Sequence, residues 1–384
     1  MNGQLLIGGH WVTAASNETL TDKYDGKAYG EMAIASAEQV SASVEGAVQG
    51  QLRSSLTPYQ RSIILSAAAN VLAGRMDFLI ELMRHEAGFT RADGDNEVRR
   101  CIQTLQLSAE EAKRLNGDMV PMQAADGVKN RIGFTLRSAR GVVCAITPFN
   151  SPLNVLAHKV APALAGGNAV VIKPSEFTPL TAVALCEVLI EAGLPADLLA
   201  LVHGPGPVIG RALLADQRIT FYAFTGSTRV GKEIQAAAGL RRTQLELGSI
   251  ASTIVCHDAD QALAIPKILN AGLRKAGQVC TSVQRLYVDR RIAGEFVPKL
   301  VEAARKMKAG DPADPATVIG PMITEAHAQR VQSWVAEALA GGAQVLTGGT
   351  RVGAVFQPTV LSGVNDQMKV MCQEVFGPVM CVVE

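Results

Sequence analysis

Cys280 is the residue of this sequence whose type and setting best suit nucleophilic chemistry. It lies in KAGQVCTSVQR, residues 275–285, between a predicted helix and a predicted strand. A lone cysteine is more often a buried core thiol, but Gly277, Gln278 and Thr281 are small or polar neighbours that favour an accessible sulfur. A thiol nucleophile also needs a lowered pKa or a nearby base. No histidine is close in sequence, so a base must come from elsewhere in the chain.

Glu246 and Asn150 are the candidate partners of that thiol. Glu246 lies in QLELGS at an apolar strand end, where burial would raise the pKa of its carboxyl and suit it to general base catalysis. Capping a helix or pairing with Arg242 is the structural alternative. Asn150 ends ITPFN and precedes Ser-Pro, so it is either a helix N-cap or an amide donor to a developing oxyanion. The residues alone leave both alternatives open.

Two glycine-rich segments come close to nucleotide-binding motifs. GPGPVIG at 204–210 is one residue longer than the dinucleotide fingerprint. GSTRVGKE at 226–233 is nearly a P-loop, but Glu233 stands where that motif needs a Mg²⁺-binding hydroxyl. A Gly-Ser-Thr turn that opens a helix still suits a phosphate or pyrophosphate. In KPSE, which ends an apolar strand, Lys173 and Glu176 form either a solvated ion pair or hydrogen bonds to an adenosine ribose.

The elements that must position these residues have an α/β pattern. From about 141 to 256, apolar strands alternate with helices, which predicts a parallel, doubly wound sheet. Ligands bind such sheets at the carboxyl ends of the strands, where each motif above falls. The expected strands are 142–146, 169–173, 199–203, 219–224 and 244–247, and the expected helices include 180–192 and 229–238.

The flanking regions differ from this central one. Helical patterns occupy 37–51, 58–75, 77–88 and 97–116. Two polar extended segments flank Asp126-Gly127 within 117–140, which favours a hairpin of the kind that often serves as a subunit-contact arm. A second α/β series follows 256, with expected helices at 260–276, 292–307 and 325–340 and strands at 285–288, 344–346 and 356–361.

Composition excludes several classes of function. The 384 residues carry a net charge of +1 without a basic stripe, so we expect a small-molecule substrate and no nucleic-acid partner. No apolar run is long enough to span a bilayer, and the N-terminus lacks a signal-peptide pattern, so we expect a cytoplasmic protein without a membrane partner. The seven cysteines include no CxxC pair, so we expect neither a disulfide framework nor a metal site.

Taken in order, these segments resemble the aldehyde dehydrogenase superfamily over nearly the whole chain. The matching motifs are TPFN ending at Asn150, KPSE at 173–176, GSTxxG at 226–231, LELG at 245–248, GQVC at 277–280 and EVFGP at 374–378. Each motif is weak alone, but their common order and spacing are specific. The resemblance implies a cofactor domain from 1–116 and 141–248, an oligomerisation hairpin at 117–140 and a catalytic α/β domain at 249–384.

The resemblance also implies hydrolytic oxidation of an aldehyde with NAD(P). Cys280 would attack the aldehyde, Asn150 and the Cys280 N–H would hold the oxyanion, and Glu246 would activate the water that hydrolyses the thioester. Lys159 matches a further lysine near the family's active site. Lys173 and Glu176 would bind the adenosine ribose, Gly226 and Ser227 the pyrophosphate, Glu374 the nicotinamide ribose and Phe376 the ring. Other implied cofactor contacts are Thr147, Pro148, Phe149, Gly206, Gly231 and Leu247.

Several further expectations follow from the resemblance. NAD is favoured over NADP because Glu176 would repel a 2′-phosphate, although NADP stays open. A homodimer or homotetramer is expected. Ser249 replaces a glycine common in the family, which resembles branches that act on small oxygenated aldehydes. The chain ends at Glu384, where family members continue, so we expect an incomplete catalytic domain.

Three other functions are alternatives to this one. One is a truncated, inactive oligomer partner that binds nucleotide. Another is a CoA-acylating enzyme, which Glu246 argues against. The third is a cysteine hydrolase, which lacks a recognisable base histidine.

Overall fold

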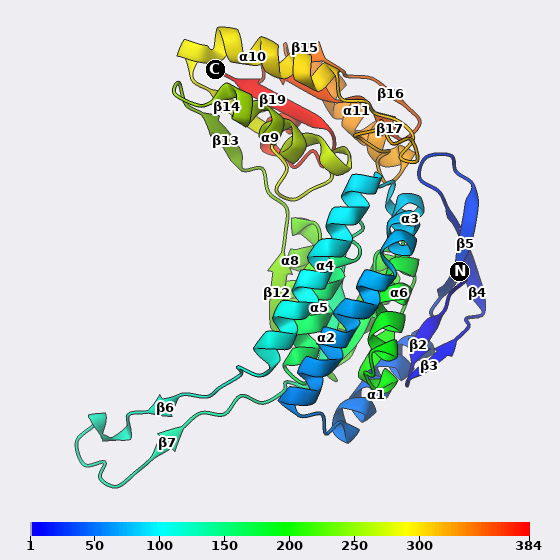
Figure 1. Cartoon of the computed structure of the whole chain (residues 1–384), viewed down its shortest axis with the longest axis vertical. Coiled ribbons are helices and arrows are strands. Elements are labelled where there is room, and N and C mark those ends of the chain that lie inside the picture. Colours follow the sequence, from blue (N-terminus) through cyan, green and yellow to red (C-terminus); the bar gives the residue numbers. More distant parts are fainter. Residues whose placement is uncertain (1) are drawn as a thin grey trace.

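Two hydrophobic cores organise the chain. The computed structural model describes residues 2–384 (Figure 1). The first core gathers buried side chains between Leu5 and Ala238, and the second gathers those between Val255 and Val382. In Figure 1 the second core lies above the first, and a hairpin extends from the opposite end of the first. Each core has its own sheet, and binding sites often lie at the boundary between two such units.

The first core is built on a seven-stranded sheet in the order β12-β11-β8-β9-β10-β2-β3. The first five of these strands are parallel, and β2 and β3 add antiparallel strands at one edge. The strands are β2 (Leu5–Ile7), β3 (His10–Val12), β8 (Val142–Ile146), β9 (Ala169–Lys173), β10 (Leu199–Leu201), β11 (Ile219–Thr225) and β12 (Arg242–Glu246). The predicted doubly wound parallel sheet is confirmed.

The direction of strand addition reverses between β8 and β11. From β8 the chain adds β9 and β10 on one side and then β11 and β12 on the other. Ligands of open α/β sheets bind outside the carboxyl ends of the strands at such a switch point. The loops after β8 and β11 carry two of the sequence motifs, Thr147–Asn150 and Gly226–Gly231. The topology therefore brings these two motifs to the expected crevice.

Helices cover the sheet, and side-chain caps fix where several of them begin. Ser36, Thr57 and Thr90 each complete a capping box at the start of a helix. The Thr90 box explains why α4 begins before the expected 97, and the helix also ends before the expected 116. The helices of this core are α1 (Ala37–Arg53), α2 (Pro58–Gly74), α3 (Met76–Ala87), α4 (Arg91–Ala112), α5 (Asn154–Ala165), α6 (Pro179–Glu191), α7 (Gly206–Ala215) and α8 (Thr228–Ala238), with the short η2 (Ala196–Leu198) before β10.

The second core contains a five-stranded sheet in the order β13-β14-β19-β18-β15. Its strands are β13 (Ser252–Val255), β14 (Arg285–Val288), β15 (Gln344–Thr347), β18 (Thr359–Ser362) and β19 (Val379–Val383). Its helices are α9 (Gln261–Leu273), α10 (Arg290–Arg305), α11 (Glu325–Ala340) and α12 (Lys369–Cys372). The single strand expected at 356–361 is wrong. Pro358 separates β17 (Val355–Phe356), which pairs with β16 (Arg351–Val352), from β18, as expected for a residue without an N–H.

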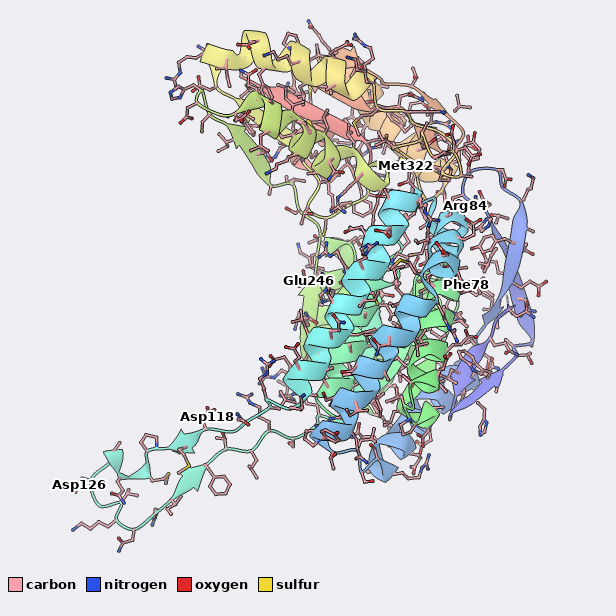
Figure 2. The ribbon with its side chains drawn as sticks, viewed as in Figure 1. Phe78, Arg84, Asp118, Asp126, Glu246 and Met322 are labelled. Atoms are coloured by element: carbon pink, nitrogen blue, oxygen red, sulfur yellow. The ribbon has the colours of Figure 1, made fainter. Side chains whose placement is uncertain are left out.

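The hairpin predicted at 117–140 forms and extends away from the sheet, as Asp118 and Asp126 mark in Figure 2. Its strands are β6 (Met119–Val120) and β7 (Gly133–Phe134), and η1 (Met122–Ala124) occupies part of the connection. Asp126-Gly127 therefore lies in a long tip and does not form a two-residue turn. A further small sheet of β1 (Asn2–Gly3), β4 (Ser16–Thr21) and β5 (Ala28–Ile34) was not expected from the sequence.

The helices of the described chain were compared with the length and hydropathy that a membrane-spanning helix needs. Across residues 2–384 no single helix is both long and apolar enough to cross a bilayer. The pair α2 and α3 meets the criteria of length and composition together, but it is bent by 75°.

Candidate active site

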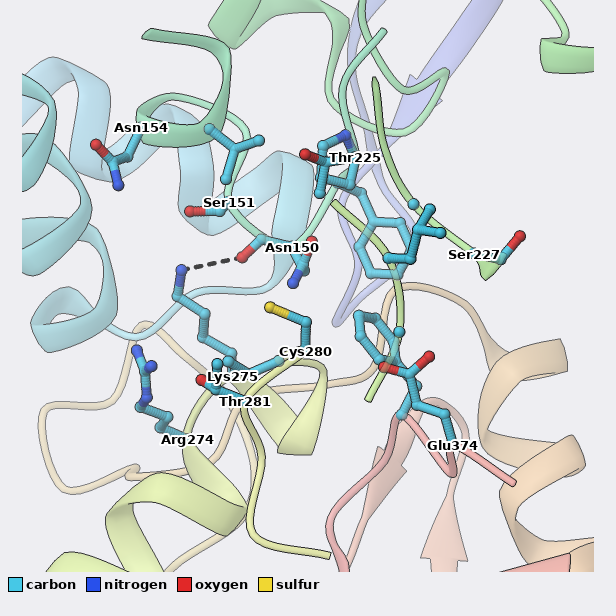
Figure 3. A pocket seen from close by; sticks show the side chains of 18 of the residues that line it. Asn150, Ser151, Asn154, Thr225, Ser227, Arg274, Lys275, Cys280, Thr281 and Glu374 are labelled. Carbon is cyan, nitrogen blue, oxygen red and sulfur yellow. Dashed lines mark hydrogen bonds between the residues drawn. The ribbon is translucent and has the colours of Figure 1, made fainter. Parts of the chain in front are cut away.

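A cavity of about 470 Å³ lies where the two cores meet at the carboxyl ends of β8 and β11. Its wall combines loops of the first core with segments of the second core around Cys280 and Glu374 (Figure 3). Nine residues singled out in the sequence line it: Pro148, Phe149, Asn150, Gly226, Ser227, Leu247, Cys280, Glu374 and Phe376. Segments that are far apart in the sequence thus form one site.

A left-handed turn presents Cys280 to this cavity. After α9, the short η3 (Arg274–Gly277) contains Lys275 and Ala276 at φ 52° and 53°, followed by Gly277 at 68°. Left-handed residues other than glycine each cost about 1–3 kcal/mol and persist only where surrounding contacts hold them. At Gly277 only glycine fits, because a Cβ would lie 2.1 Å from the carbonyl oxygen of Gly377. The Cys280 thiol at the end of this turn is exposed.

Two buried side chains hold the turn in place. The Lys275 ammonium lies 2.8 Å from Glu97 Oε2 and donates a hydrogen bond of 2.9 Å to the carbonyl oxygen of Asn150. The Gln278 amide donates to the carbonyl oxygen of Lys275, and its Oε1 accepts from the N–H of Ile323. The strained backbone before Cys280 is therefore fixed by contacts to both cores.

Asn150 does not cap a helix. Helix α5 begins at Asn154, and the N–H of Asn154 donates to Glu97 Oε1 at 2.9 Å. The Glu97 carboxylate from α4 thus accepts from the first N–H of this helix, which was one of the two roles expected for Asn150. Figure 3 shows the Asn150 side chain next to the Cys280 sulfur. Both residues line the same cavity, and an amide there can donate a hydrogen bond to an oxyanion on a carbon attached to the Cys280 sulfur.

Glu246 and Lys159 lie outside the cavity lining. Glu246 ends β12 and is exposed, so the expectation of a buried carboxylate is wrong (Figure 2). The physical reason is that β12 is an edge strand whose alternate residues, including Gln244, face outward. Lys159 on α5 is buried, and this desolvation lowers its pKa to about 8, while the nearby charge of Glu246 acts in the opposite direction. The two groups therefore interact electrostatically.

Lys173, Glu176 and Gly206 also lie outside the cavity lining but come together with one another. Lys173 ends β9, is buried, and its Nζ lies 3.3 Å from Glu176 Oε2. Burial lowers the pKa of Lys173, and Glu176 opposes this shift. A Cβ at Gly206, the first residue of α7, would lie 3.9 Å from Lys173 Nζ. An ion pair at the strand end thus forms beside a helix start.

The GSTxxG turn opens α8 as expected. Ser227 is the N-cap, and its hydroxyl accepts from the N–H of Val230. Gly231 in the first turn packs against Leu247, because a Cβ there would lie 2.4 Å from that side chain. Close packing of helix and strand holds the N-terminus of α8 at the cavity edge. Thr147, directly after β8, is buried and does not line the cavity.

Two buried side-chain oxygens at the site have no hydrogen-bond partner in the described chain. They bear on whether a dinucleotide fits here. Within residues 2–384, Glu374 Oε1 and Thr225 Oγ1 make no hydrogen bond. Glu374 lies against Gly248, where a Cβ would come within 2.2 Å of its carboxylate, and burial raises the pKa of Glu374. Buried polar atoms nearly always have a partner. The two orphaned oxygens therefore fit a ligand with hydroxyl or amide donors. No group of three or more potential metal ligands gathers among these same residues.

Sequence reasoning missed several residues of the cavity wall. Arg100 on α4 and Arg274 in η3 both line it, and neither guanidinium forms an ion pair within residues 2–384. Arg274 could have been found from its closeness to Cys280 in the sequence, whereas no local pattern marks Arg100. Other lining residues, to which the sequence assigned no role in binding or catalysis, are Glu97, Ser151, Asn154, Val155, His158, Thr225, Gly248, Lys275, Val279, Thr281, His327 and Arg330.

Comparison with known proteins gives a consistent result. The family described as "Aldehyde dehydrogenase family" matches residues 11–384. A 3-sulfolactaldehyde dehydrogenase of Priestia aryabhattai is 44% identical over 380 residues, which are 99% of this chain and 80% of that protein.

Two solved structures show the same fold. An NAD-dependent aldehyde dehydrogenase from Sinorhizobium meliloti superposes with a TM-score of 0.95 at 33% identity, covering 100% of this chain and 78% of that one. An NADP-dependent glyceraldehyde-3-phosphate dehydrogenase from Bacillus halodurans, complexed with NADP, gives 0.96 at 33% identity, covering 100% and 81%.

Proposed function

This chain belongs to the aldehyde dehydrogenase family, and on that premise we propose that it oxidises small anionic aldehydes to carboxylic acids with NAD(P), using Cys280 as nucleophile. The observation that carries the proposal is the meeting of Cys280 and Asn150 in one cavity at the switch point of the sheet. The experiment that tests it is formation of reduced nicotinamide from a panel of small aldehydes, with and without a negative charge.

The side chains of the cavity have the following roles in this proposal. The exposed Cys280 thiol loses its proton to water and its sulfur adds to the aldehyde carbon, while the Asn150 amide and the Cys280 N–H stabilise the resulting oxyanion. NAD(P), when bound, supplies the acceptor for the hydride that the oxidation releases. Glu246 removes a proton from the water that cleaves the thioester on Cys280, which frees the acid and the thiol. Exposure of Glu246 gives it access to that water.

The cofactor contacts are proposed on the same basis. Glu374 and Thr225 offer the two unpartnered oxygens, Gly226 and Ser227 lie at the N-terminus of α8, and Lys173 with Glu176 lies at the end of β9. Thr147, Pro148, Phe149, Gly206, Gly231, Leu247 and Phe376 complete the proposed set. We propose NAD as the preferred cofactor, because the Glu176 carboxylate would repel a 2′-phosphate. A kcat/KM higher with NADP than with NAD would overturn this preference.

Lys159 is proposed to take the proton that Glu246 removes from water. Its pKa lies at about 8, so the neutral amine that can accept a proton becomes more abundant as pH rises through 8. We therefore expect thioester hydrolysis to accelerate over this pH range and the acceleration to disappear in Lys159→Met. Steady-state turnover under conditions where hydrolysis limits the rate measures the effect. A rise that persists unchanged in Lys159→Met contradicts this role.

The anionic substrate class rests on Arg100 and Arg274. Both line the cavity that contains Cys280, and neither has a carboxylate partner within residues 2–384. Lys275 is a poorer candidate, because Glu97 already compensates its charge. The names of similar proteins add support, since 3-sulfolactaldehyde carries a sulfonate and glyceraldehyde 3-phosphate a phosphate. Unpaired guanidinium groups are well suited to bind such groups.

Substituting these arginines should separate charged from uncharged substrates. In Arg274→Gln and Arg100→Gln we expect KM for a sulfonated or phosphorylated aldehyde to rise about 10- to 100-fold, the effect of losing a hydrogen bond to a charged group. KM for propanal should stay near its original value. Arg99→Gln is the matched control, because Arg99 is exposed on α4 and paired with Asp95. An equal rise in KM for charged and uncharged aldehydes would contradict the assignment of these arginines to binding an anionic group.

The two cores and the hairpin have separate roles in this proposal. We propose that 1–116 with 141–248 binds the cofactor, that 249–384 carries the nucleophile, and that the 117–140 hairpin mediates a homodimer or homotetramer. The hairpin supports this because Met119, Ile132, Phe134 and Leu136 are exposed on it. Light scattering should give a multiple of the chain mass, and shortening the hairpin should lower it. A cytoplasmic location stays a prediction from the sequence.

A further inference from the structure

A buried ion pair joins the two cores next to the proposed oxyanion site. Lys275 comes from η3 at the start of the Cys280 turn, and Glu97 comes from the middle of α4. Their side chains are 4% and 2% exposed, and Lys275 Nζ lies 2.8 Å from Glu97 Oε2. The partners are 178 residues apart in sequence. This contact is therefore a tertiary feature of the site, distinct from the surface ion pairs between helix neighbours.

Both members of the pair also bind the Asn150 loop. Lys275 Nζ donates to the carbonyl oxygen of Asn150 at 2.9 Å, the bond drawn in Figure 3, and lies 4.3 Å from the centre of the Phe89 ring. Glu97 Oε1 accepts from the Ser151 hydroxyl at 2.6 Å and from the Asn154 N–H at 2.9 Å. One ammonium and one carboxylate thus connect α4, the Asn150 loop and the Cys280 turn.

We propose that Lys275 and Glu97 are positioning residues that fix the Asn150 amide relative to the Cys280 sulfur. The proposal rests on the function proposed above. Neither residue contacts the reacting atoms in this role. Lys275 acts through the backbone of Asn150 on one side and, five residues along the chain, through the left-handed turn that ends at Cys280 on the other. Glu97 acts by holding the Lys275 ammonium at 2.8 Å and by accepting from the N–H of Asn154, the first residue of α5.

The geometry favours this role over substrate binding by Lys275. Both acceptors of its ammonium are supplied by the protein, whereas Arg274 next to it has none. The turn at Lys275 and Ala276 adopts a conformation that residues with a Cβ rarely keep without support. Loss of the ammonium removes that support, and the turn can relax. The Asn150 amide then loses its fixed position relative to the Cys280 sulfur, and a misplacement of about 1 Å lowers turnover about 100-fold.

A double-mutant cycle with Asn150 tests the proposal. In Lys275→Met we expect kcat to fall about 100-fold while KM for NAD changes little. In the Asn150→Ala background the same substitution should lower kcat by no more than about threefold, because both changes act through one amide and are not additive. Lys267→Met is the control, since Lys267 is exposed on α9, and it should leave kcat unchanged.

Other outcomes overturn the proposal. Equal losses from Lys275→Met in both backgrounds would mean a general structural role, and a kcat near that of the wild type would mean no role. If Lys275→Met does not fold, Glu97→Gln replaces it in the same cycle, with the same non-additivity expected, because it removes the charge that holds Lys275. An inactive wild-type chain would be a separate failure, of the proposed function itself, and the proposal would fall with it.

Discussion

Replacing Cys280 by alanine should abolish formation of reduced nicotinamide from every aldehyde, with a fall in kcat of about 10⁴-fold or more. The reason is that the proposed route passes through a covalent bond to this sulfur. Among the cysteines of residues 2–384, Cys280 is the one that lines the active-site cavity. Cys256 and Cys372 are also exposed but lie outside that cavity. The measurement is absorbance of reduced nicotinamide with saturating NAD and aldehyde.

A matched control separates loss of chemistry from loss of structure. Cys256→Ala removes an exposed thiol of the second core and should leave kcat unchanged. Cys280→Ala should still bind NADH, seen as a change in the fluorescence of the reduced nicotinamide, because the proposed cofactor contacts do not include the sulfur. Substantial turnover in Cys280→Ala would refute the nucleophile assignment. Loss of both turnover and NADH binding would point to a disturbed fold.

Glu246→Gln should stop the reaction after its first half. We expect a rapid burst of reduced nicotinamide that matches the number of active sites, followed by a steady state about 10²- to 10³-fold slower than in the wild type. The amide cannot accept a proton from water, so the thioester accumulates. Rapid mixing with NAD and aldehyde measures both phases. Hydroxylamine, which needs no general base to attack a thioester, should raise the slow rate.

The control for this variant is Glu233→Gln, because Glu233 is exposed on α8 and paired with Arg229. It should show wild-type turnover. Absence of a burst in Glu246→Gln would mean that the carboxylate acts before the thioester forms, most simply as the base for the Cys280 thiol. That result would move Glu246 to a different step of the reaction, and the hydrolytic base would have to be found elsewhere.

The sheet could be predicted from the sequence because its signals are local. VVCAI at β8 and AVVIK at β9 are uninterrupted apolar runs, as strands covered on both faces require. The motifs follow such strands directly, so the meeting of Asn150 and Gly226 at one edge could be expected from parallel topology. The bounds of β8, β9, β14 and α11 agree with those expected, because Gly, Pro and capping residues delimit these elements.

The remaining features depend on contacts between distant segments. Glu246 is exposed because strand order leaves β12 at an edge, which no local pattern specifies. Asn150 is not a cap because Glu97, from a helix far away in sequence, takes that position. The ion pair of Lys275 with Glu97 and the unpaired Arg100 likewise arise only when α4 lies against the Cys280 turn. The short strands of the N-terminal sheet carry too few residues for a periodic signal.

The most direct measurement of the central claim is the mass of the Glu246→Gln chain after mixing with NAD and glyceraldehyde 3-phosphate, followed by peptide mapping. The account predicts an added acyl group on the peptide that contains Cys280, together with an equal amount of reduced nicotinamide. Reduced nicotinamide without an adduct on this cysteine, or an adduct on another residue, would contradict it.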